Sequence, residues 1–346
     1  MSTRSLFLDR CLGEQRGVVL LDGEPERLLI AREEDAPAVQ VGARVAARVR
    51  KVEPAFASAF LDLGDGHEAL LSFKPDARPV EGRLVEVEIR SEPRTGKLAT
   101  VRVIGPADGA PRLLAPAPDL ETQLRAYSKG CDVIEGARAR TIADEAEDEA
   151  LQTIHPLPGG GTLAIEPTRA LVAVDVDLGE RKGQDAKRIT RQANLSALGA
   201  CARLLRLKGL GGIVVIDLVG RGHDGAALMA AARAAFAPDN PGVAIGPVGR
   251  FGTMEFSIPR RGRSVREVLL DASGAPTDTT LAIRLIRLAE SVAEQDRGAR
   301  LVARGVPSVI ALAEPLSKRL AARIGNRLVL QPQQDWPRER LEVFSA

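Results

Sequence analysis

Two short apolar segments that each end in an aspartate, with a long amphipathic segment between them, constrain the fold of this chain most. Residues 170–175 and 212–217 are rich in Val and Ile, which favour β-strands. Residues 185–207 place apolar side chains four positions apart, as one face of an α-helix does. The order strand, helix, strand predicts an α/β unit. The β-branched run at 212–217 is typical of a strand buried on both faces.

The size and composition of the chain predict a globular protein. Its 346 residues exceed one ordinary hydrophobic core, so two or three compact units are expected. Apolar residues make up 45% and charged residues 27%, which excludes a disordered chain. No stretch reaches the roughly 18 apolar residues that cross a bilayer, and the first ten residues lack a signal core. We therefore expect a cytoplasmic protein that does not enter membranes.

The cysteines and histidines argue against a zinc site. The three cysteines form no Cys-x-x-Cys pair, so buried thiols are expected rather than disulfides or a zinc knuckle. The histidines are not spaced as a ligand pair. These residues are Cys11, Cys131, Cys201, His67, His155 and His223. Any metal is therefore expected to be held by oxygen atoms.

Five alternating segments predict a small barrel. They are residues 41–52, 55–63, 68–73, 83–89 and 97–103, with glycine-containing turns after the second and before the fifth. Five strands in about 65 residues fit an OB-type barrel better than a sandwich. Such barrels often bind single-stranded nucleic acid.

The segments that flank the barrel are expected to form one further unit. A hairpin over residues 18–21 and 27–31 precedes the barrel, and a strand at 132–135 with a helix at 137–150 follows it. Residues 106–118 contain four prolines and are interpreted as a linker.

The rest of the chain extends the α/β pattern. Residues 162–166 are expected to form a hairpin with 170–175. A helix at 224–236 and strands at 243–248 and 254–259 follow. From residue 277 a short α/β module is predicted, which opens with the helix 281–297.

Positive charge is concentrated in two segments, although the net charge is only +2. Residues 178–210 hold eight Lys or Arg against two acids, and a second basic run spans 250–266. Such runs fit phosphate contacts, but two solvated faces would produce the same pattern.

Three aspartates outline a magnesium site. Asp175 and Asp217 each end an apolar strand, and in open α/β sheets ligands bind at the carboxyl ends of strands. Asp177 lies two residues beyond Asp175 and is expected to project to the same side. Mg²⁺ is usually held by one or two carboxylates together with phosphate oxygens. The alternative is that these aspartates only cap the turns that follow their strands.

Several motifs between residues 156 and 270 resemble the catalytic core of the ribonuclease E/G family. In order they are Leu-Pro-Gly-Gly-Gly-Thr, Ala-Val-Asp-Val-Asp, Gln-Ala-Asn-Leu, Arg-Leu-Lys-Gly-Leu-Gly-Gly-Ile-Val-Val-Ile-Asp and Gly-Arg-Phe-Gly-Thr-Met-Glu-Phe-Ser. The likeness extends to the N-terminal hairpin, the barrel around Ala-Phe-Leu-Asp-Leu-Gly, and the C-terminal module. It implies a metal-dependent endoribonuclease that cleaves single-stranded RNA in RNA processing or decay, by attack of a magnesium-activated water on the phosphodiester.

The resemblance also implies a multi-domain α+β and α/β organisation. Residues 1–38 and 117–153 would form an RNase H-like subdomain, into which an S1-type OB barrel at 39–105 is inserted. A DNase I-like α/β catalytic subdomain would follow at 154–272, and a small C-terminal α/β domain at 277–346.

The resemblance assigns roles to single residues. Asp175 and Asp217 match the metal-binding aspartates and, with Asp177, form the catalytic set for Mg²⁺ or Mn²⁺. Asp177 stands where the family usually has asparagine, and Gly220 where it has a second acid. The barrel's second aromatic position is Leu70, which should weaken its grip because stacking contributes roughly 1–3 kcal/mol per base. The RNA-binding residues implied by the barrel and the basic runs are Phe60, Lys97, Arg181, Lys182, Arg188, Arg191, Arg260 and Arg261.

Two family elements are missing from the expected organisation. The barrel leads almost directly into the proline-rich segment, where the family places a domain that senses the 5′ end of RNA. Residues 271–277 stand where the family has the cysteine pair that links subunits through zinc. We interpret the chain as a compact member, with no zinc and no zinc-linked tetramer, and leave its oligomeric state open.

Two other functions compete with the nuclease. The first is an RNA-binding protein of the same family with weakened catalysis, because Asp177 and Leu70 depart from the family pattern. The second is a structural adaptor, which leaves the aspartates and the basic runs without a role.

Overall fold

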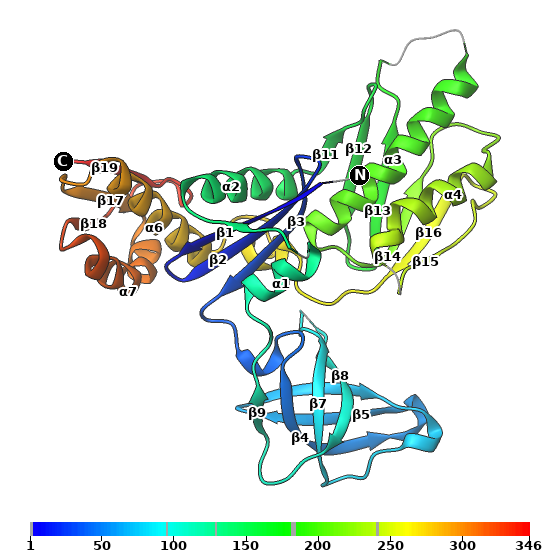
Figure 1. Ribbon diagram of the computed structural model, residues 1–346, viewed down its shortest axis with the longest axis horizontal. Helices are drawn as coiled ribbons and strands as arrows, with labels where there is room; N and C mark the ends of the chain where they lie inside the picture. Colours follow the sequence, from blue (N-terminus) through cyan, green and yellow to red (C-terminus); the bar gives the residue numbers. More distant parts are fainter. Residues whose placement is uncertain (1–2, 95, 129, 181–184, 240–241) are drawn as a thin grey trace.

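The computed structural model describes residues 3–94, 96–128, 130–180, 185–239 and 242–346. It is a mixed α+β fold in which three sheets pack with helices and a fourth sheet closes into an OB-like barrel. The barrel projects from an elongated body that carries the C-terminal module at one end and a six-stranded sheet at the other (Figure 1). No helix in these ranges combines the length and the apolar composition that crossing a bilayer requires.

The first sheet has the strand order β10-β1-β2-β3. Its strands are β1 (Arg4–Cys11), β2 (Glu14–Leu21), β3 (Glu24–Arg32) and β10 (Val133–Ile134). Helix α1 (Leu120–Tyr127) covers one face, and α2 (Ala137–Leu151) packs on the other. The hairpin β2–β3 and helix α2 follow the sequence prediction, whereas β1 and α1 were not predicted.

The barrel contains the five predicted strands and one more. The strands are β4 (Arg44–Glu53), β5 (Ser58–Gly64), β6 (His67–Ser72), β7 (Leu84–Ser91), β8 (Ala99–Pro106) and β9 (Arg112–Ala115). Pairing of β4 with β5 closes the barrel.

Strand β9 corrects part of the linker prediction for residues 106–118. It pairs antiparallel with the start of β4, from Arg44 to Ala46. Leu113 and Leu114 are both exposed, so backbone hydrogen bonds rather than an apolar face hold this strand. Residues 112–115 carry no alternating pattern, so this strand could not be predicted.

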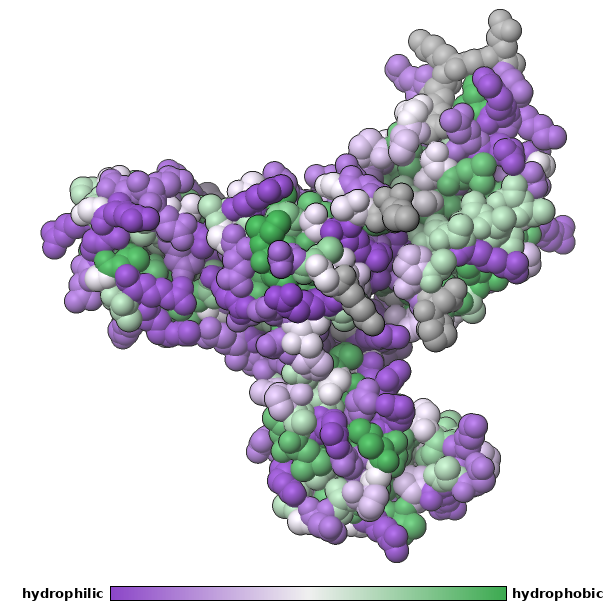
Figure 2. Space-filling view, in the orientation of Figure 1, coloured by the Kyte–Doolittle hydropathy of each residue, from purple (hydrophilic) through white to green (hydrophobic). Residues whose placement is uncertain are grey.

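The six-stranded sheet has the order β11-β12-β13-β14-β16-β15. Its strands are β11 (Ile154–Pro156), β12 (Thr162–Pro167), β13 (Val172–Asp177), β14 (Gly212–Asp217), β15 (Ala244–Ile245) and β16 (Thr253–Ile258). Strands β13 and β14 are parallel, as a strand–helix–strand unit requires. Helices α3 (Ala186–Lys208) and α4 (Gly225–Phe236) cover one face, and Figure 2 shows the alanine-rich surface of α4 in pale green.

The opposite face of this sheet is open, which corrects the expectation that the strand at 212–217 is buried on both faces. Val214 and Ile216 are buried under the helices, but Ile213 on the other face is 56% exposed. The β-branched run reflects the strand propensity of Val and Ile, which does not depend on a second covering layer.

The C-terminal module follows as predicted. Its elements, together with the short helix before it, are α5 (Val265–Leu269), α6 (Asp278–Gln295), β17 (Leu301–Gly305), α7 (Pro307–Ile324), β18 (Leu328–Pro332) and β19 (Glu342–Ser345). The strands form a three-stranded sheet that packs against α6 and α7.

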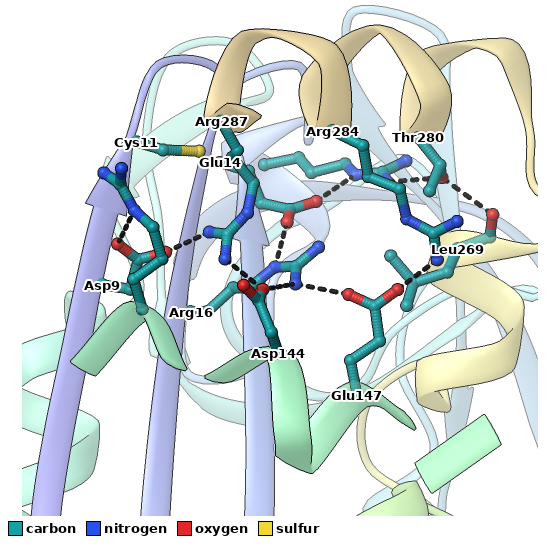
Figure 3. Close-up of polar contacts among 12 residues, drawn as sticks. Asp9, Cys11, Glu14, Arg16, Asp144, Glu147, Leu269, Thr280, Arg284 and Arg287 are labelled. Atoms are coloured by element: carbon teal, nitrogen blue, oxygen red, sulfur yellow. Dashed lines mark hydrogen bonds and ion pairs between the residues drawn. The ribbon is translucent and has the colours of Figure 1, made fainter. Parts of the chain in front are cut away.

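A network of mostly buried charges docks α6 onto the first sheet and α2 (Figure 3). Arg16 of β2 is 1% exposed and binds Glu14 at 2.5 Å as well as Glu147 of α2. Arg287 of α6 binds Asp9 of β1 in the same network. We call these side chains the α6 ion network: Asp9, Glu14, Arg16, Asp144, Glu147, Arg284 and Arg287.

The pKa values show that partners outweigh burial in this network. Burial alone would raise the pKa of Glu14, but the guanidiniums of Arg16 and Arg32 outweigh it and lower that pKa. Burial would likewise lower the pKa of Arg287, yet Asp9 and Asp144 raise it. Both groups are therefore held in their charged forms.

Candidate functional site

Asp175 and Asp217 are direct register partners on the parallel strands β13 and β14. Neighbouring strands lie about 4.8 Å apart, and paired residues project to the same face. Both aspartates are exposed on the open face, while Val174 and Ile216 beside them are buried under the helices. The structure thus brings the two acids together, as their positions at strand ends predicted.

The two aspartates form a like-charge pair. Within the described ranges, neither Asp175 nor Asp217 has a side-chain hydrogen bond or an ion pair, so neither caps a turn there. Like charges directly opposite each other on adjacent strands destabilise a sheet. A bound cation would remove that repulsion.

Asp177 combines exposure with a capping role. It ends β13 on the same face as Asp175, and its carboxylate accepts a hydrogen bond from the backbone N–H of Gly179. The capping alternative therefore holds for Asp177, although one of its oxygens is left for a ligand.

A glycine allows the preceding turn to lie against the end of β13. Gly161, from the Leu-Pro-Gly-Gly-Gly-Thr motif, has a φ of +80°, and a Cβ there would lie 2.2 Å from the carbonyl oxygen of Asp177. Only glycine fits this close backbone approach without strain.

The loop after Asp217 is held by helix α3. Asn194 is fully buried; its amide donates to the carbonyl of Val219 at 3.0 Å and accepts from the N–H of Val219 at 3.1 Å. Gly220 has a φ of +89°, and a Cβ there would lie 2.5 Å from Cγ2 of Thr190. This position, where the resemblance placed a second acid, therefore takes no side chain without local rearrangement.

A tight turn between β15 and β16 borders the site on its other side. Thr253 is the register partner of Asp217, and the N–H of Leu218 donates to the carbonyl of Gly252 at 3.1 Å. The turn carries Arg250 and Phe251, and the Phe251 side chain is 83% exposed. The sequence analysis named Arg250 only as the start of the second basic run and did not single out Phe251, although both lie in the quoted Gly-Arg-Phe-Gly motif.

Several cations lie on the helix and the loop that follow the two carboxylates in the chain. Arg188 is exposed on the first turn of α3, and Arg191 forms an ion pair with Asp224 at 3.5 Å. Arg221, which sequence analysis missed, is exposed in the loop that follows Asp217. Arg181 and Lys182 lie outside the residues that the structure describes.

Except for Arg250, the arginines of the second basic run lie at the opposite end of the sheet. They follow β16, and Ile258 at the end of that strand pairs with Gly212, five residues from Asp217. At about 3.3 Å per residue this places Arg260 and Arg261 roughly 17 Å or more from Asp217. Arg260 is ion-paired with Glu267, and Arg261 lines a cavity of about 530 Å³ between the first sheet, α3 and the barrel.

The barrel meets the body next to these arginines. The N–H of Glu92 donates to the carbonyl of Arg261 at 2.8 Å, and Lys97 is exposed on the same β7–β8 loop. Phe60 is half-buried on β5, with Lys51 and Leu70 as its register partners. The predicted RNA contacts therefore form two groups, one near the carboxylates and one at the junction with the barrel.

The residues fit a cation that is shared with a substrate. In the part of the chain with defined placement, no three Asp, Glu, His or Cys side chains are grouped closely enough to enclose an ion by themselves. Two adjacent carboxylates, with phosphate oxygens and water as further ligands, are a donor set that Mg²⁺ accepts.

Known proteins resemble part of this chain. Residues 114–261 match the family described as Ribonuclease E/G family. Ribonuclease E of Escherichia coli (strain K12) is 28% identical over 186 residues, which is 51% of this chain and 17% of that protein. Ribonuclease E of Haemophilus influenzae is 34% identical over 123 residues, 35% of this chain and 13% of that protein.

A plant relative gives a similar match. The chloroplastic Ribonuclease E/G-like protein of Arabidopsis thaliana is 34% identical over 106 residues, 30% of this chain and 10% of that protein. The matched part of the chain thus spans less than a fifth of the length of these three relatives. Over residues 114–261, the chain is thus similar to the ribonuclease E/G family.

Proposed function

We propose that the chain is an endoribonuclease that cleaves single-stranded RNA at the Asp175–Asp217 pair with the help of Mg²⁺ or Mn²⁺. The observation that carries this proposal is the register pairing of two exposed, unpartnered carboxylates on the open face of the sheet. Similarity to a family of endoribonucleases supports the same reaction.

Each residue of the site has a proposed task. Asp175 and Asp217 hold the cation, and Asp177, fixed by its bond to Gly179, orients the ligands around it. When bound, the cation supplies positive charge to the phosphoryl oxygens and lowers the pKa of the water that attacks phosphorus. Arg188 and Arg221 offset the charge of neighbouring phosphates.

The RNA is proposed to extend from the barrel to the carboxylates. Lys97, Arg261 and Phe60 contact the strand at the barrel end, and Arg188 and Arg191 contact it at the catalytic end. The other proposed contacts are Arg260, Arg181 and Lys182. Arg191 and Arg260 must exchange their present partners, Asp224 and Glu267, for phosphate.

The sheets also support the domain organisation that the resemblance implied. We propose that the first sheet with α1 and α2 is the RNase H-like subdomain and that the barrel is of the S1 type. The six-stranded sheet then corresponds to the DNase I-like catalytic subdomain, and α6 to β19 form the small C-terminal domain.

The proposal is tested with end-labelled single-stranded RNA, with Mg²⁺ and with a chelator. We expect Asp217→Asn and Asp175→Asn to lose cleavage while RNA affinity and the unfolding midpoint stay near those of the parent chain, because the amide keeps the volume but not the ligand charge. Asp335→Asn, an exposed aspartate of the C-terminal module, is the matched control and should cleave normally. Cleavage that survives both site substitutions, or that ignores the chelator, would refute the assignment.

Asp177→Asn restores the residue that the family usually has. We expect it to be tolerated or to raise the rate, because the amide can still accept the hydrogen bond from Gly179 while it removes one negative charge. A loss as deep as that of Asp175→Asn would identify Asp177 as an essential ligand.

RNA binding without cleavage is the second candidate function. It is favoured by Leu70, which lies beside Phe60 where a second stacking ring is expected. The same assay distinguishes the two functions, because a binding protein would retain RNA in the presence of Mg²⁺ without producing fragments.

A further inference from the structure

Phe251 is the most exposed large apolar side chain described near the carboxylates. It is 83% exposed, and the guanidinium carbon of Arg250 lies 5.1 Å from the centre of its ring. A single exposed apolar residue is common on a protein surface and proves nothing alone. Its position, the rigidity of its turn and its charged neighbours together indicate a role in binding a ligand.

The position follows from strand register. Thr253 is opposite Asp217, and Phe251 lies two residues before Thr253 in the chain. Consecutive Cα atoms are about 3.8 Å apart and paired strands about 4.8 Å, so the Cα atoms of Phe251 and Asp217 lie within roughly 12 Å of each other. One nucleotide can span that separation.

The turn is fixed to the site rather than free. The N–H of Gly249 donates to the carbonyl of Thr253 at 2.8 Å, and the N–H of Gly252 donates to Gly249 at 3.0 Å. Gly252 also packs on the loop after Asp217, because a Cβ there would lie 3.2 Å from Nε2 of His223. A ring held in this way loses little entropy when a ligand stacks on it.

The charged residues around Phe251 indicate which class of ligand it binds. Arg250 and Arg221 are exposed cations, and Asp217 is an exposed acid, so the ring stands in a charged setting and not in an apolar patch. A protein partner would need a contiguous apolar surface. An aromatic face next to arginines instead matches a nucleotide, whose base stacks while its phosphate meets the cations.

We infer that Phe251, with Arg250 on its ring, stacks the base of a nucleotide that flanks the phosphodiester at Asp217. This inference rests on the proposed function and adds a binding subsite to it. Since every base has a π-face, the subsite positions the strand without reading its sequence.

The first test walks a single abasic nucleotide through a short single-stranded RNA. In the parent chain, kcat/KM should fall about 5- to 150-fold when one position next to the cleaved bond lacks its base, which corresponds to a stacking loss of roughly 1–3 kcal/mol. Phe251→Ala should show the same loss on intact RNA and no further loss at that position. Phe251→Tyr should restore the parent pattern.

Phe344→Ala is the matched control. Phe344 lies in the C-terminal module, is 37% exposed, and has the guanidinium carbon of Arg304 at 4.8 Å from its ring centre. Its removal should leave cleavage unchanged. Phe251→Ala that cleaves as fast as the parent chain, or a parent chain that tolerates the abasic nucleotide at every position, would overturn the inference.

A second readout separates this inference from the proposed function. Trp336 is the only tryptophan, so Phe251→Trp in a Trp336→Phe background reports on position 251 alone. Intact RNA should quench this fluorescence more than RNA that is abasic throughout, even if no variant cleaves and the nuclease proposal has failed. Unchanged fluorescence, or a drop in oligomer mass in Phe251→Ala that points to a contact between chains, would refute stacking.

Discussion

Two groups of charged side chains in this chain follow opposite rules. On the open sheet face, Asp175 and Asp217 lie side by side in water and have no partner in the described chain. In the α6 ion network, Arg16 and Glu14 are almost completely buried and bind each other directly. One group leaves its charges uncompensated, and the other compensates every charge that it buries.

This difference in burial and pairing indicates that the two groups have different roles. A charge that is buried without a partner costs several kcal/mol, so the network had to be closed for α6 to dock at all. Exposed carboxylates cost little individually, but a cross-strand pair of them is unfavourable and gains nothing within the described fold. The open pair therefore points to a ligand, and the closed network points to a domain contact.

The largest effects are expected when one residue of each group is substituted, because stability should fall in one case and cleavage in the other. Arg16→Met removes the buried cation that Glu14 and Glu147 share and leaves each acid with one remaining arginine, Arg32 or Arg284. We expect it to lower the free energy of unfolding by about 3–5 kcal/mol, while folded molecules still cleave RNA. Asp175→Asn should do the reverse, with cleavage lost and stability unchanged or slightly higher. Urea unfolding followed by circular dichroism measures the first quantity.

An exposed ion pair at the same interface is the control. Arg319 of α7 binds Glu33 at the surface, so Arg319→Met should cost less than about 1 kcal/mol. Equal losses for Arg16→Met and Arg319→Met would break the comparison, because burial would then not matter.

The next largest effect is that of salt, which should weaken RNA binding much more than it changes the stability provided by the α6 ion network. If four to six phosphates are contacted, RNA affinity should fall about 50- to 300-fold between about 50 and 200 mM salt. The free energy of unfolding should change far less, since buried pairs are poorly screened. Filter binding and urea unfolding across the same salt series provide the data, and a salt-independent affinity would remove the proposed phosphate contacts.

A buried histidine, in which burial outweighs a nearby acid, gives a third case. His155 points inward from β11 and is 3% exposed, and burial, reinforced by the positive charge of Lys208, lowers its pKa from 6.5 to about 4. Between about pH 4 and 6.5, His155 is therefore protonated in the unfolded chain but neutral in the folded chain. This contribution to stability is present above pH 6.5 and is lost as the pH falls towards 4.

The effect is measured as a difference between two proteins. From pH 7 to pH 4.5, the parent chain should lose about 1–3 kcal/mol more unfolding free energy than His155→Gln, in which the titrating group is absent. Parallel stability curves for the two proteins would show that His155 does not titrate in this way.

The smallest effects concern regulation and assembly. Only residues 116–119 separate β9 from α1, and α6 is docked by ion pairs. We therefore expect cleavage of 5′-monophosphate and 5′-hydroxyl RNA to agree within a few-fold, and zinc chelators to leave the oligomer mass unchanged. Burial raises the pKa values of the Cys11 and Cys201 thiols to about 12, which disfavours metal binding by either.

Kinetics on the paired RNAs and light scattering with chelator check these expectations. A strong preference for the monophosphate would mean that residues 110–150 form a pocket for it. A zinc-dependent mass would direct attention to His155 or His223.

Local patterns explain what could be predicted from the sequence. The barrel strands, the hairpin β2–β3 and the unit β13–α3–β14 each carry a period of two or of nearly four, so their positions were predicted within a few residues. The approach of Asp175 to Asp217 followed from their places at strand ends.

Features that depend on distant contacts were missed. Strand β9 is defined by backbone pairing with β4, and the ion pair of Asp9 with Arg287 joins residues 278 positions apart. The open face of β14 and the exposure of Phe251 result from the absence of a covering element in the described fold. A local sequence pattern does not contain this information.

The register of β13 with β14 also bears on how such a protein can change over generations. The spacing of the two aspartates is set by the hydrogen-bond ladder of one sheet and by no contact with the barrel or the C-terminal module. If the proposed function holds, variation in those outer parts can alter which RNA is captured while the reacting geometry is inherited intact. Substrate choice and chemistry are thus separable traits in a single chain.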